Sequence, residues 1–307
     1  MRLINQSYEI WNQPAGLEGV YKQIERVGRI CYKSEDKITE DSAKPFVDRM
    51  IKSGHGAMLE HGTIYLAIPM TTYAPEAVNI YRHNSYSKVN ECNKFIFTDK
   101  YGDKVAAWCV TTNLRVLVEN DCLEDLEFLC EPTEYHERRV TVHFVCDRGV
   151  SHEFVRHRVM SFAQESTRYC NYSKNKFGNE LTFIIPSWCS NRDEVHIVPD
   201  KYDVDWNDKL IEDFGNEQGR LYIGLALAEK AYLDLLKIGW TPQQARTVLP
   251  NSLKTELVIT GFVSDWKHFF RVRSRIAETG KPHPQAQELA DPLMDEFIKR
   301  GIMETLI

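Results

Sequence analysis

Residues 156–169 read Arg-His-Arg-Val-Met-Ser-Phe-Ala-Gln-Glu-Ser-Thr-Arg-Tyr, and they end a stretch whose charge differs from that of the rest of the chain. Positions 138–168 hold six arginines, no lysine and three acidic residues, whereas the whole chain of 307 residues has a net charge of −6. Arginine offers a planar fork of donors that suits phosphate or carboxylate, whereas lysine offers a point charge. The stretch therefore indicates small anionic ligands.

An ordinary explanation for such a stretch is a solvated helix face with ion pairs, and two details argue against it. Arg156, His157 and Arg158 are flanked on both sides by apolar residues, which predicts that the charges lie in a buried segment. Neutral hydrogen-bonding groups follow them, namely Ser161, Gln164, Ser166 and Thr167. Because a buried charge without a partner is destabilising, we expect an anionic ligand or an ion-pair network there.

The composition is that of a compact globular protein, with 43% hydrophobic and 27% charged residues over a length that supports one large domain or two small ones. The acidic net charge argues against a general nucleic-acid binder. No apolar run approaches the roughly 20 residues that cross a bilayer. The amino terminus also lacks the basic and apolar regions of a signal peptide. We therefore expect a cytoplasmic protein with no membrane and no nucleic-acid partner.

Three familiar kinds of site are absent from the sequence. The eight cysteines form no Cys-x-x-Cys pair, so free and mostly buried thiols are expected rather than zinc ligands or disulfides. His152 and His157 are five positions apart instead of four, which turns them away from a common helix face, and no metal site is predicted. No glycine pattern matches the dinucleotide fingerprint or the phosphate loop.

The hydrophobic periodicity predicts a mixture of helices and strands, and therefore an α+β fold. Helices are expected over 14–33, 41–53, 123–130 and 221–238, and from Pro284 onward. Two more are expected to begin near Ser151, which would be the N-cap, and after Thr241. Another is expected to start at Ser264 or Asp265 and to run through Arg273. Strands are expected over 63–68, 104–118, 140–146 and 255–262, with a long loop and short strands over 171–216. The helix 221–238 is apolar around most of its circumference, which predicts burial in the core or in a subunit interface.

Three blocks of sequence together resemble one protein family. Arg156-His157-Arg158, seven intervening residues and Ser166 match the RHRx7S signature of flavin-dependent thymidylate synthases, the ThyX family. The block 54–61 resembles the start of that family's flavin-side helix. The blocks 244–250 and 269–273, with His283-Pro284, resemble its carboxy-terminal half in order and spacing. Residues 70–137 match nothing in the shorter members, so we interpret the chain as a single ThyX-like catalytic domain, 1–307, with an insertion at about 70–137.

The resemblance implies a fold, a reaction and an assembly. The fold would be a central, mostly antiparallel sheet flanked by helices. The reaction would be the reductive methylation of dUMP to dTMP, with a methylene group from 5,10-methylenetetrahydrofolate, hydride from reduced FAD, and NADPH as the reductant of FAD. A nucleotide monophosphate and a flavin diphosphate both require arginines, which the sequence supplies. The assembly would be a homotetramer whose active sites combine several subunits.

The resemblance also implies roles for individual residues. Arg273 corresponds to an arginine that stabilises charge on the pyrimidine ring, and His55 to a histidine near flavin and folate, so these two are the candidate catalytic residues. The candidate substrate-binding residues are Glu153, Arg156, Gln164, Glu165, Ser166, Thr167, Arg168, Arg246 and Arg273. The candidate cofactor-binding residues are Ala57, Glu60, Arg156, His157, Arg158, Gln164 and His268. Ala57 lacks a hydroxyl, so it would contribute only its backbone.

Two departures from the family's pattern keep other functions open. Phe262 and Ser264 replace the Asn and the basic residue expected at the adenosine end of the flavin. One alternative is therefore a non-catalytic nucleotide-binding or regulatory homologue that retains the dUMP pocket. Another is a different flavoenzyme that acts on pyrimidine nucleotides.

Overall fold

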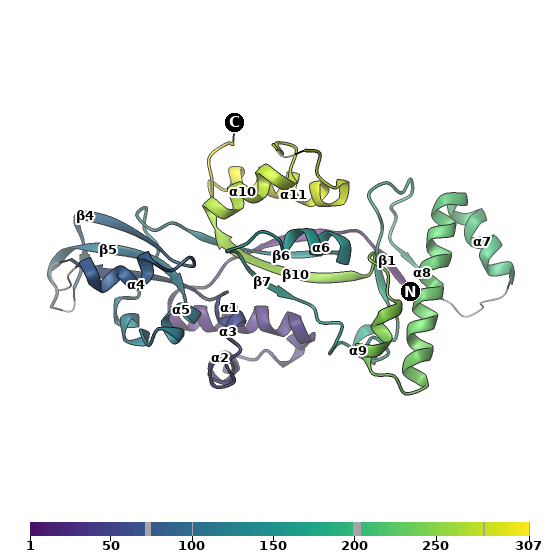
Figure 1. The fold of residues 1–307 in the computed structure, drawn as a ribbon, viewed down its shortest axis with the longest axis horizontal. Helices are drawn as coiled ribbons and strands as arrows, with labels where there is room; N and C mark the ends of the chain where they lie inside the picture. The colour runs from purple at the N-terminus through teal and green to yellow at the C-terminus, as the bar shows by residue number, and fades with distance from the viewer. Residues whose placement is uncertain (71–74, 100, 199–203, 279, 307) are drawn as a thin grey trace.

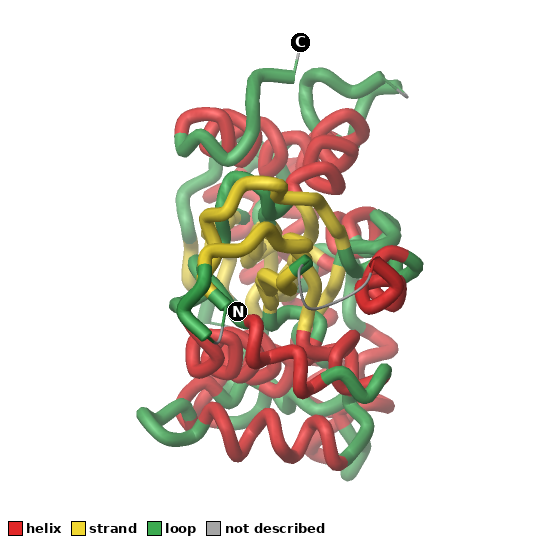
Figure 2. The backbone as a smooth tube through the Cα atoms, turned by 90° about the vertical axis from the view of Figure 1, so that its left-hand side faces the viewer, coloured by secondary structure: helices red, strands yellow, loops and turns green. Residues whose placement is uncertain are grey.

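The computed structural model describes residues 1–70, 75–99, 101–198, 204–278 and 280–306. These residues form three sheets, and helices lie on both sides of the strands (Figure 1; Figure 2). Of the strand pairs in the described residues, β1 with β8 is parallel and the others are antiparallel. The α+β class with mostly antiparallel sheets is therefore confirmed.

The central sheet has four strands in the order β2-β6-β10-β7. They are β2 (Ser7–Trp11), β6 (Arg139–Asp147), β10 (Lys254–Phe262) and β7 (Ser161–Gln164). The long strands β6 and β10 pair along their whole length and confirm the strands predicted at 140–146 and 255–262. β2 and the four-residue β7 form the two edges, so the chain that follows β7 lies at an open side of the sheet.

Three helices cover one face of this sheet: α6 (Arg148–Phe154), α10 (Val263–Arg273) and α11 (Pro284–Lys299) (Figure 1). Aromatic rings fill the space between them and the sheet. Phe154 and Trp266 each meet the ring of Phe269 edge to face, with centroids 4.9 and 5.2 Å apart. Such pairs add to the burial of apolar area and fix α10 against α6.

The starts of α6 and α10 differ from the sequence prediction by a few residues. Asp147 caps α6 by accepting a hydrogen bond from the Val150 amide at 2.6 Å, so Ser151 lies inside the helix. In α10, the carboxylate of Asp265 reaches back to the Phe262 amide at 3.1 Å. In both helices a carboxylate satisfies an amide that the first turn leaves unpaired.

The opposite face is covered by α1 (Gly16–Tyr32), α2 (Ala43–Lys52) and the short α3 (Gly56–Leu59), with η1 (Glu35–Lys37) between the first two (Figure 1). α1 packs Val27 and Ile30 against Ala163 of β7 and Val258 of β10. These helices confirm the predictions for 14–33 and 41–53. The end of α1 reaches the end of β7, which places it beside the candidate site.

A second antiparallel sheet, in the order β3-β5-β4, extends the molecule at one end (Figure 1). It contains β3 (Thr63–Pro69), β5 (Lys104–Asn113) and β4 (Lys88–Thr98), with η2 (Pro75–Val78), α4 (Asn79–Arg82), α5 (Leu114–Glu119) and η3 (Leu123–Phe128) around it. The expected extended segment 104–118 breaks at Asn113, whose side chain accepts a hydrogen bond from the Val116 amide at 3.2 Å and starts α5. The sequence does not predict β4, because most of its side chains are exposed.

A small sheet at the other end joins β8 (Thr182–Ile184), β1 (Arg2–Ile4) and β9 (Val195–His196). It shares a core with α8 (Asn216–Lys237), and α7 (Val204–Phe214), α9 (Pro242–Ala245), η4 (Asn175–Phe177) and η5 (Arg246–Val248) complete this region. α7 corrects the loop predicted for 171–216. α8 confirms the helix at 221–238, but only one stripe of it is buried: Tyr222 and Tyr232 are fully buried, whereas Leu227 is 55% exposed.

Candidate functional site

The residues named from the sequence fall into three groups around β7. One group lies between α6 and α10 on one face of the central sheet, a second follows the end of β7, and the third is the turn around His55 between α2 and β3. Hydrogen bonds connect β7 and the residues after it to the helices on either side: Gln164 donates to the Ser151 hydroxyl of α6 at 2.8 Å, and the Ser166 amide donates to the Cys31 carbonyl of α1 at 3.0 Å. β7, the edge strand of the central sheet, therefore connects the elements around the candidate site.

Arg273 is the centre of the group between α6 and α10. Its guanidinium donates to the carboxylate of Glu153 and, at 2.9 Å, to the carbonyl of the same residue. Its Nε donates to Nε2 of His157 at 3.1 Å, and the ring of His268 lies beside that of His157 with centroids 5.8 Å apart. Four residues predicted separately from the sequence are thus brought together from α6, the turn after it, and α10.

Burial and the charge of Arg273 keep His157 neutral. Its pKa is lowered to about 4, first by burial, then by the charge of Arg273 and by the electrostatic interaction with His268. Burial also lowers the pKa of Arg273; the carboxylate of Glu153 opposes this change and the charge of Arg156 adds to it. A guanidinium held by a carboxylate, a carbonyl and a ring nitrogen has a fixed orientation.

Two exposed arginines, Arg168 and Arg246, lie beyond the end of β7. Arg246 donates to the hydroxyl of Thr167 at 3.2 Å, and Arg168 donates to the side chain of Gln243 at 3.1 Å. Gln243 lies in α9, and Arg246 begins η5, which follows α9 directly. Neither arginine has an ion-pair partner among the described residues. Two unpaired guanidinium groups on different elements suit an anionic group of a ligand.

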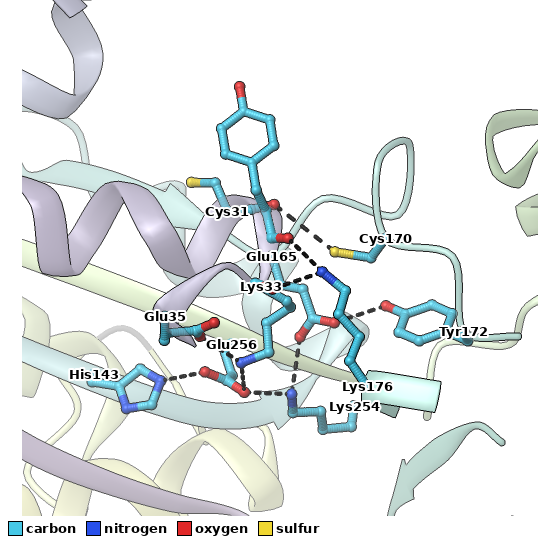
Figure 3. Close-up of polar contacts among 11 residues, drawn as sticks. Cys31, Lys33, Glu35, His143, Glu165, Cys170, Tyr172, Lys176, Lys254 and Glu256 are labelled. Atoms are coloured by element: carbon cyan, nitrogen blue, oxygen red, sulfur yellow. Dashed lines mark hydrogen bonds and ion pairs between the residues drawn. The ribbon is translucent and has the colours of Figure 1, made fainter. Parts of the chain in front are cut away.

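Glu165 belongs to a buried polar network (Figure 3). Its carboxylate accepts hydrogen bonds from the Tyr172 hydroxyl and from Nζ of Lys254, both at 2.9 Å, and the residue is 3% exposed. Glu165 is therefore placed to anchor the run 164–168, since its carboxylate already has protein partners.

The network continues to the end of α1 through Glu256 (Figure 3). Lys254 and Lys33 both pair with the Glu256 carboxylate at 2.5 Å, and His143 contacts its other oxygen at 3.0 Å. Although burial raises the pKa of Glu256, the hydrogen bond from His143 and the two lysine charges hold it well below its usual range. The sequence indicates only the pair Lys254 and Glu256, which are two positions apart in a strand and therefore lie on the same face.

The turn around His55 borders a cavity of about 390 Å³. His55 and Ala57 are exposed at its rim, and Phe46 is among the apolar residues that line it. The carboxylate of Glu60 is buried beside this turn and pairs with Arg115 at 2.5 Å. A partly aromatic cavity with polar groups at its rim suits a flat ring system.

Two arginines support this turn, and the sequence assigns no role to either. Arg139 is almost fully buried and donates to the Glu60 carbonyl at 2.9 Å and to the Ser161 hydroxyl at 3.2 Å. Arg115 of α5 holds the Glu60 side chain. The arginine count draws attention to Arg139 without explaining it, and nothing in the sequence around Arg115 marks it as part of a site.

Arg156 and Arg158 lie on the surface, contrary to the expectation that their segment is buried. Only every third residue of the run points inward, namely Phe154, His157 and Met160. α6 ends at Phe154, and the chain then turns through Val159, whose φ of 75° is in the left-handed region that β-branched residues avoid. The turn leaves both guanidinium groups open to an anionic ligand, without ion-pair partners in the part of the chain that the structure describes.

The two departures at 262 and 264 lie where β10 passes into α10. Phe262 is buried, and the cationic groups of Arg139 and Lys88 lie 5.5 and 5.6 Å from its ring centre. The Ser264 amide donates to Glu137 at 3.1 Å. Phe262 therefore offers no hydrogen bond to a ligand at this end of the site.

The cysteines are all free, as predicted. Burial raises the pKa of the Cys31 thiol to about 11 and those of Cys109, Cys130 and Cys170 to about 12, so these thiols are protonated near neutral pH. The described residues contain no group of three His, Cys, Asp or Glu side chains that could hold a metal ion. Within the same residues, no helix has both the length and the apolar character to cross a membrane.

Comparison with known sequences identifies one family. Residues 134–300, just over half of the chain, match the family described as thymidylate synthase complementing protein. The flavin-dependent thymidylate synthase of Pyrococcus abyssi is 26% identical over 162 residues, which are 53% of this chain and 55% of that one. The corresponding protein of Thermococcus onnurineus is 31% identical over 129 residues, 42% and 43% of the two chains. The chain thus spans about half the length of the curated relatives that it matches.

A solved structure aligns along most of the chain. The UMP/dUMP methylase PolB of Streptomyces cacaoi, bound with 5-Br dUMP, covers 97% of this chain and 93% of its own, with 16% identity and a TM-score of 0.42. A likeness at this score supports no conclusion by itself.

Proposed function

Because the chain belongs to the family of thymidylate synthase complementing proteins, we propose that it is a flavin-dependent thymidylate synthase. In this reaction dUMP becomes dTMP; 5,10-methylenetetrahydrofolate supplies the carbon, reduced FAD supplies hydride, and NADPH reduces the FAD. The observation that carries the proposal is the setting of Arg273: Glu153 and His157 fix its guanidinium, and its side chain is 15% exposed.

Arg273 supplies the electrostatic part of the chemistry. Carbon 5 of the pyrimidine becomes nucleophilic toward the methylene group when negative charge develops on the ring, and a guanidinium beside the ring amide stabilises that charge. Glu153 and His157 orient the guanidinium in advance, so little rearrangement is needed during the reaction. Because His157 is neutral, the positive charge of this group resides on Arg273.

Arg168 and Arg246 bind the phosphate of dUMP in this proposal. Both guanidinium groups are exposed, lack ion-pair partners among the described residues, and are held by Gln243 and Thr167 respectively. Arginine pairs with phosphate through two parallel hydrogen bonds, which fixes the orientation of the nucleotide as well as its position.

FAD would be held by the His55 turn and by the exposed Arg156 and Arg158. The cavity beside His55 offers an apolar floor for a ring system, and unpaired arginines suit a diphosphate. Ala57 offers its backbone alone. When bound and reduced, FAD supplies the hydride that completes the methyl group. The buried Phe262 leaves the adenosine end with fewer side-chain contacts than the family's pattern predicts.

The proposal includes a homotetramer in the cytoplasm, with one catalytic domain over 1–307 and an insertion at about 70–137. The family match begins at residue 134, close to the end of that insertion. In a single chain Arg156, Arg158, Arg168 and Arg246 are open to solvent, and α8 exposes Leu227 on its outer side. A second subunit that covers such surfaces would complete an active site built from several chains.

The test begins with a visible spectrum of the purified protein, with and without added FAD and dUMP. Formation of dTMP is then measured with dUMP, 5,10-methylenetetrahydrofolate, FAD and NADPH. We expect flavin absorbance and NADPH-dependent formation of dTMP. Protein that neither carries nor gains flavin absorbance contradicts the proposal.

A second candidate function is a nucleotide-binding or regulatory protein without turnover. The observation that favours it is the burial of Phe262 at the position where the family's pattern has a hydrogen-bonding side chain. It predicts binding of dUMP by calorimetry and no dTMP when all of the reactants are present.

A further inference from the structure

Arg138 and Arg139, the first arginines of the positively charged stretch, have no part in the proposed reaction, yet both line a cavity of about 290 Å³. The cavity lies where β2 ends and β6 begins, and residues 12–16 and 129–132 form its sides. We infer that this cavity binds a small organic oxyanion, a phosphate or a carboxylate. The inference goes beyond the proposed function, which assigns no ligand to this place.

Arg138 gives the cavity donors that the protein leaves unused, and Arg139 adds a second positive charge. Arg138 is exposed and has no ion-pair partner in the described part of the chain. Arg139 is 8% exposed, and its Nε has no hydrogen-bond partner in the described structure, although its two terminal nitrogens donate to protein oxygens. The guanidinium of Arg139 is thus held inside the protein and contributes its charge to the lining, whereas the donors of Arg138 remain free for an oxyanion.

The pKa of Tyr65 indicates that the charges of Arg138, Arg139 and Glu131 all act at this cavity. Burial raises the pKa of the Tyr65 phenol, and so does the charge of Glu131. The pKa is lowered by the hydrogen bond from the Arg139 amide and by the charges of Arg139 and Arg138. All four residues line the cavity. Glu131 is the one acidic residue among the described lining residues, so the lining has a net positive charge.

The start of α1 adds positive potential from a second direction. Pro14, Ala15 and Gly16 line the cavity, and Ala15 is the N-cap of this 17-residue helix. No side chain caps the helix, so its first amides remain available to a ligand. An uncapped helix start beside unpaired arginines favours phosphate and carboxylate groups.

The rest of the lining sets the size of the ligand. Trp11, Tyr65, Ile10 and Ile302 contribute aromatic and apolar surface, and the volume is at the lower end of the range for small-molecule sites. A bare inorganic ion would leave this surface uncovered. The ligand therefore joins its anionic group to a small apolar or aromatic body.

The cavity is separate from the residues proposed to bind dUMP. It lies at the β2 edge of the central sheet, whereas Arg168 and Arg246 lie beyond β7, the opposite edge. Binding at the two places is therefore distinguishable by mutation.

The test measures binding of inorganic phosphate, phenyl phosphate and benzoate by isothermal titration calorimetry. Phenyl phosphate is expected to bind more tightly than inorganic phosphate, and its comparison with benzoate separates a phosphate site from a carboxylate site. Arg138→Gln is expected to weaken binding of the preferred probe about tenfold, because it removes a charged donor. Lys22→Gln removes the same charge from an exposed position of α1 and should leave affinity unchanged.

Ala15→Asp provides a second variant with opposite effects on stability and binding. Its carboxylate would cap α1, which raises Tm by about 2 °C, and it would also occupy the anion position, which weakens binding about tenfold or more. A purely structural role for the cavity predicts the first change without the second.

The inference is overturned if the wild-type protein binds none of the probes, or if Arg138→Gln and Ala15→Asp bind them as tightly as the wild type. Loss of all binding in Arg168→Ala alone would also overturn it, because the anion would then lie at the proposed dUMP site. A failure to form dTMP bears only on the proposed function.

Discussion

The central sheet and the β3-β5-β4 sheet are covered in different ways. Helices lie on both faces of the central sheet, and the polar residues of the candidate site emerge where its strands end. The second sheet packs one side on its own core, and its edge strand β4 is mostly exposed. In a sheet that is buried on both faces, charged side chains reach the surface mainly where the strands end. The second sheet reaches the site through Arg115, which holds Glu60.

The largest expected effect is in the central sheet's own site. Arg273→Ala should lower the rate of dTMP formation by about 10³-fold, because it removes the group that stabilises charge on the pyrimidine. Circular dichroism should show an unchanged fold, and Arg273→Lys should recover only a small part of the rate, since lysine cannot reproduce the fork of donors. Unchanged turnover in Arg273→Ala would remove the role assigned to this residue.

The junction between the two sheets is expected to weaken in acid. His61, just before β3, contacts the Thr260 hydroxyl of β10 at 2.8 Å, and burial, with the charge of Arg139, lowers its pKa to about 3 from an ordinary 6.5. Below pH 6.5 the unfolded chain protonates this ring and the folded chain does not, so stability falls as the pH drops toward the folded value. His157, with a pKa of about 4, acts in the same direction.

Urea unfolding at pH 7 and pH 4.5 measures this effect. Each of the two histidines should contribute a loss on the order of 2 kcal/mol at the lower pH. His61→Asn, which keeps a polar group opposite Thr260, should remove about half of the loss. Equal free energies of unfolding for the wild type at the two pH values would contradict the prediction.

A smaller effect tests whether the second sheet contributes to the site. Arg115→Ala should weaken FAD binding about tenfold, because the carboxylate of Glu60 loses its charged partner and the His55 turn loses a support. Flavin fluorescence measures the dissociation constant, and Arg115→Lys should restore part of the affinity. Lys94→Ala is the matched control, since Lys94 is exposed, pairs with Glu134 at 3.6 Å, and has its ammonium group 5.4 Å from the ring centre of Tyr135. Equal affinities in all of these proteins would confine the site to the central sheet.

The smallest expected effect concerns the second sheet alone. Asn113→Ala removes the cap of α5 and should lower the free energy of unfolding by about 1 kcal/mol. Asn113→Ser, which retains an oxygen near the Val116 amide, should lower it by less. Differential scanning calorimetry compares the two variants, and a Tm of Asn113→Ala equal to that of the wild type would show that the cap adds nothing.

The sequence predicts the central sheet better than the second one, and the reason is physical. β6 and β10 consist of long runs of buried residues, so their apolar pattern is strong. β4 presents mostly exposed side chains, and β5 passes into α5 at Asn113 through a side-chain hydrogen bond that hydropathy does not encode. The helix α7 is missed for a similar reason, because it lies in a polar region with few periodic signals.

For the candidate site, the sequence indicates which residues take part but not where their side chains point. The arginine excess and the family signature indicate which residues gather around β7, and the structure brings Glu153, His157, His268 and Arg273 into contact. The direction in which a side chain points is not contained in such a signature. Glu165 therefore enters a buried network, and Arg156 with its neighbour Arg158 lies on the surface rather than inside.

The protonated thiols have a consequence for the chemical resistance of this protein. Burial raises the pKa of seven of the eight cysteines, and the eighth, Cys92, is fully buried. Alkylating agents and peroxides react with thiolates, which are scarce here near neutral pH. Reagents that require a thiolate should therefore react slowly with these seven cysteines near neutral pH.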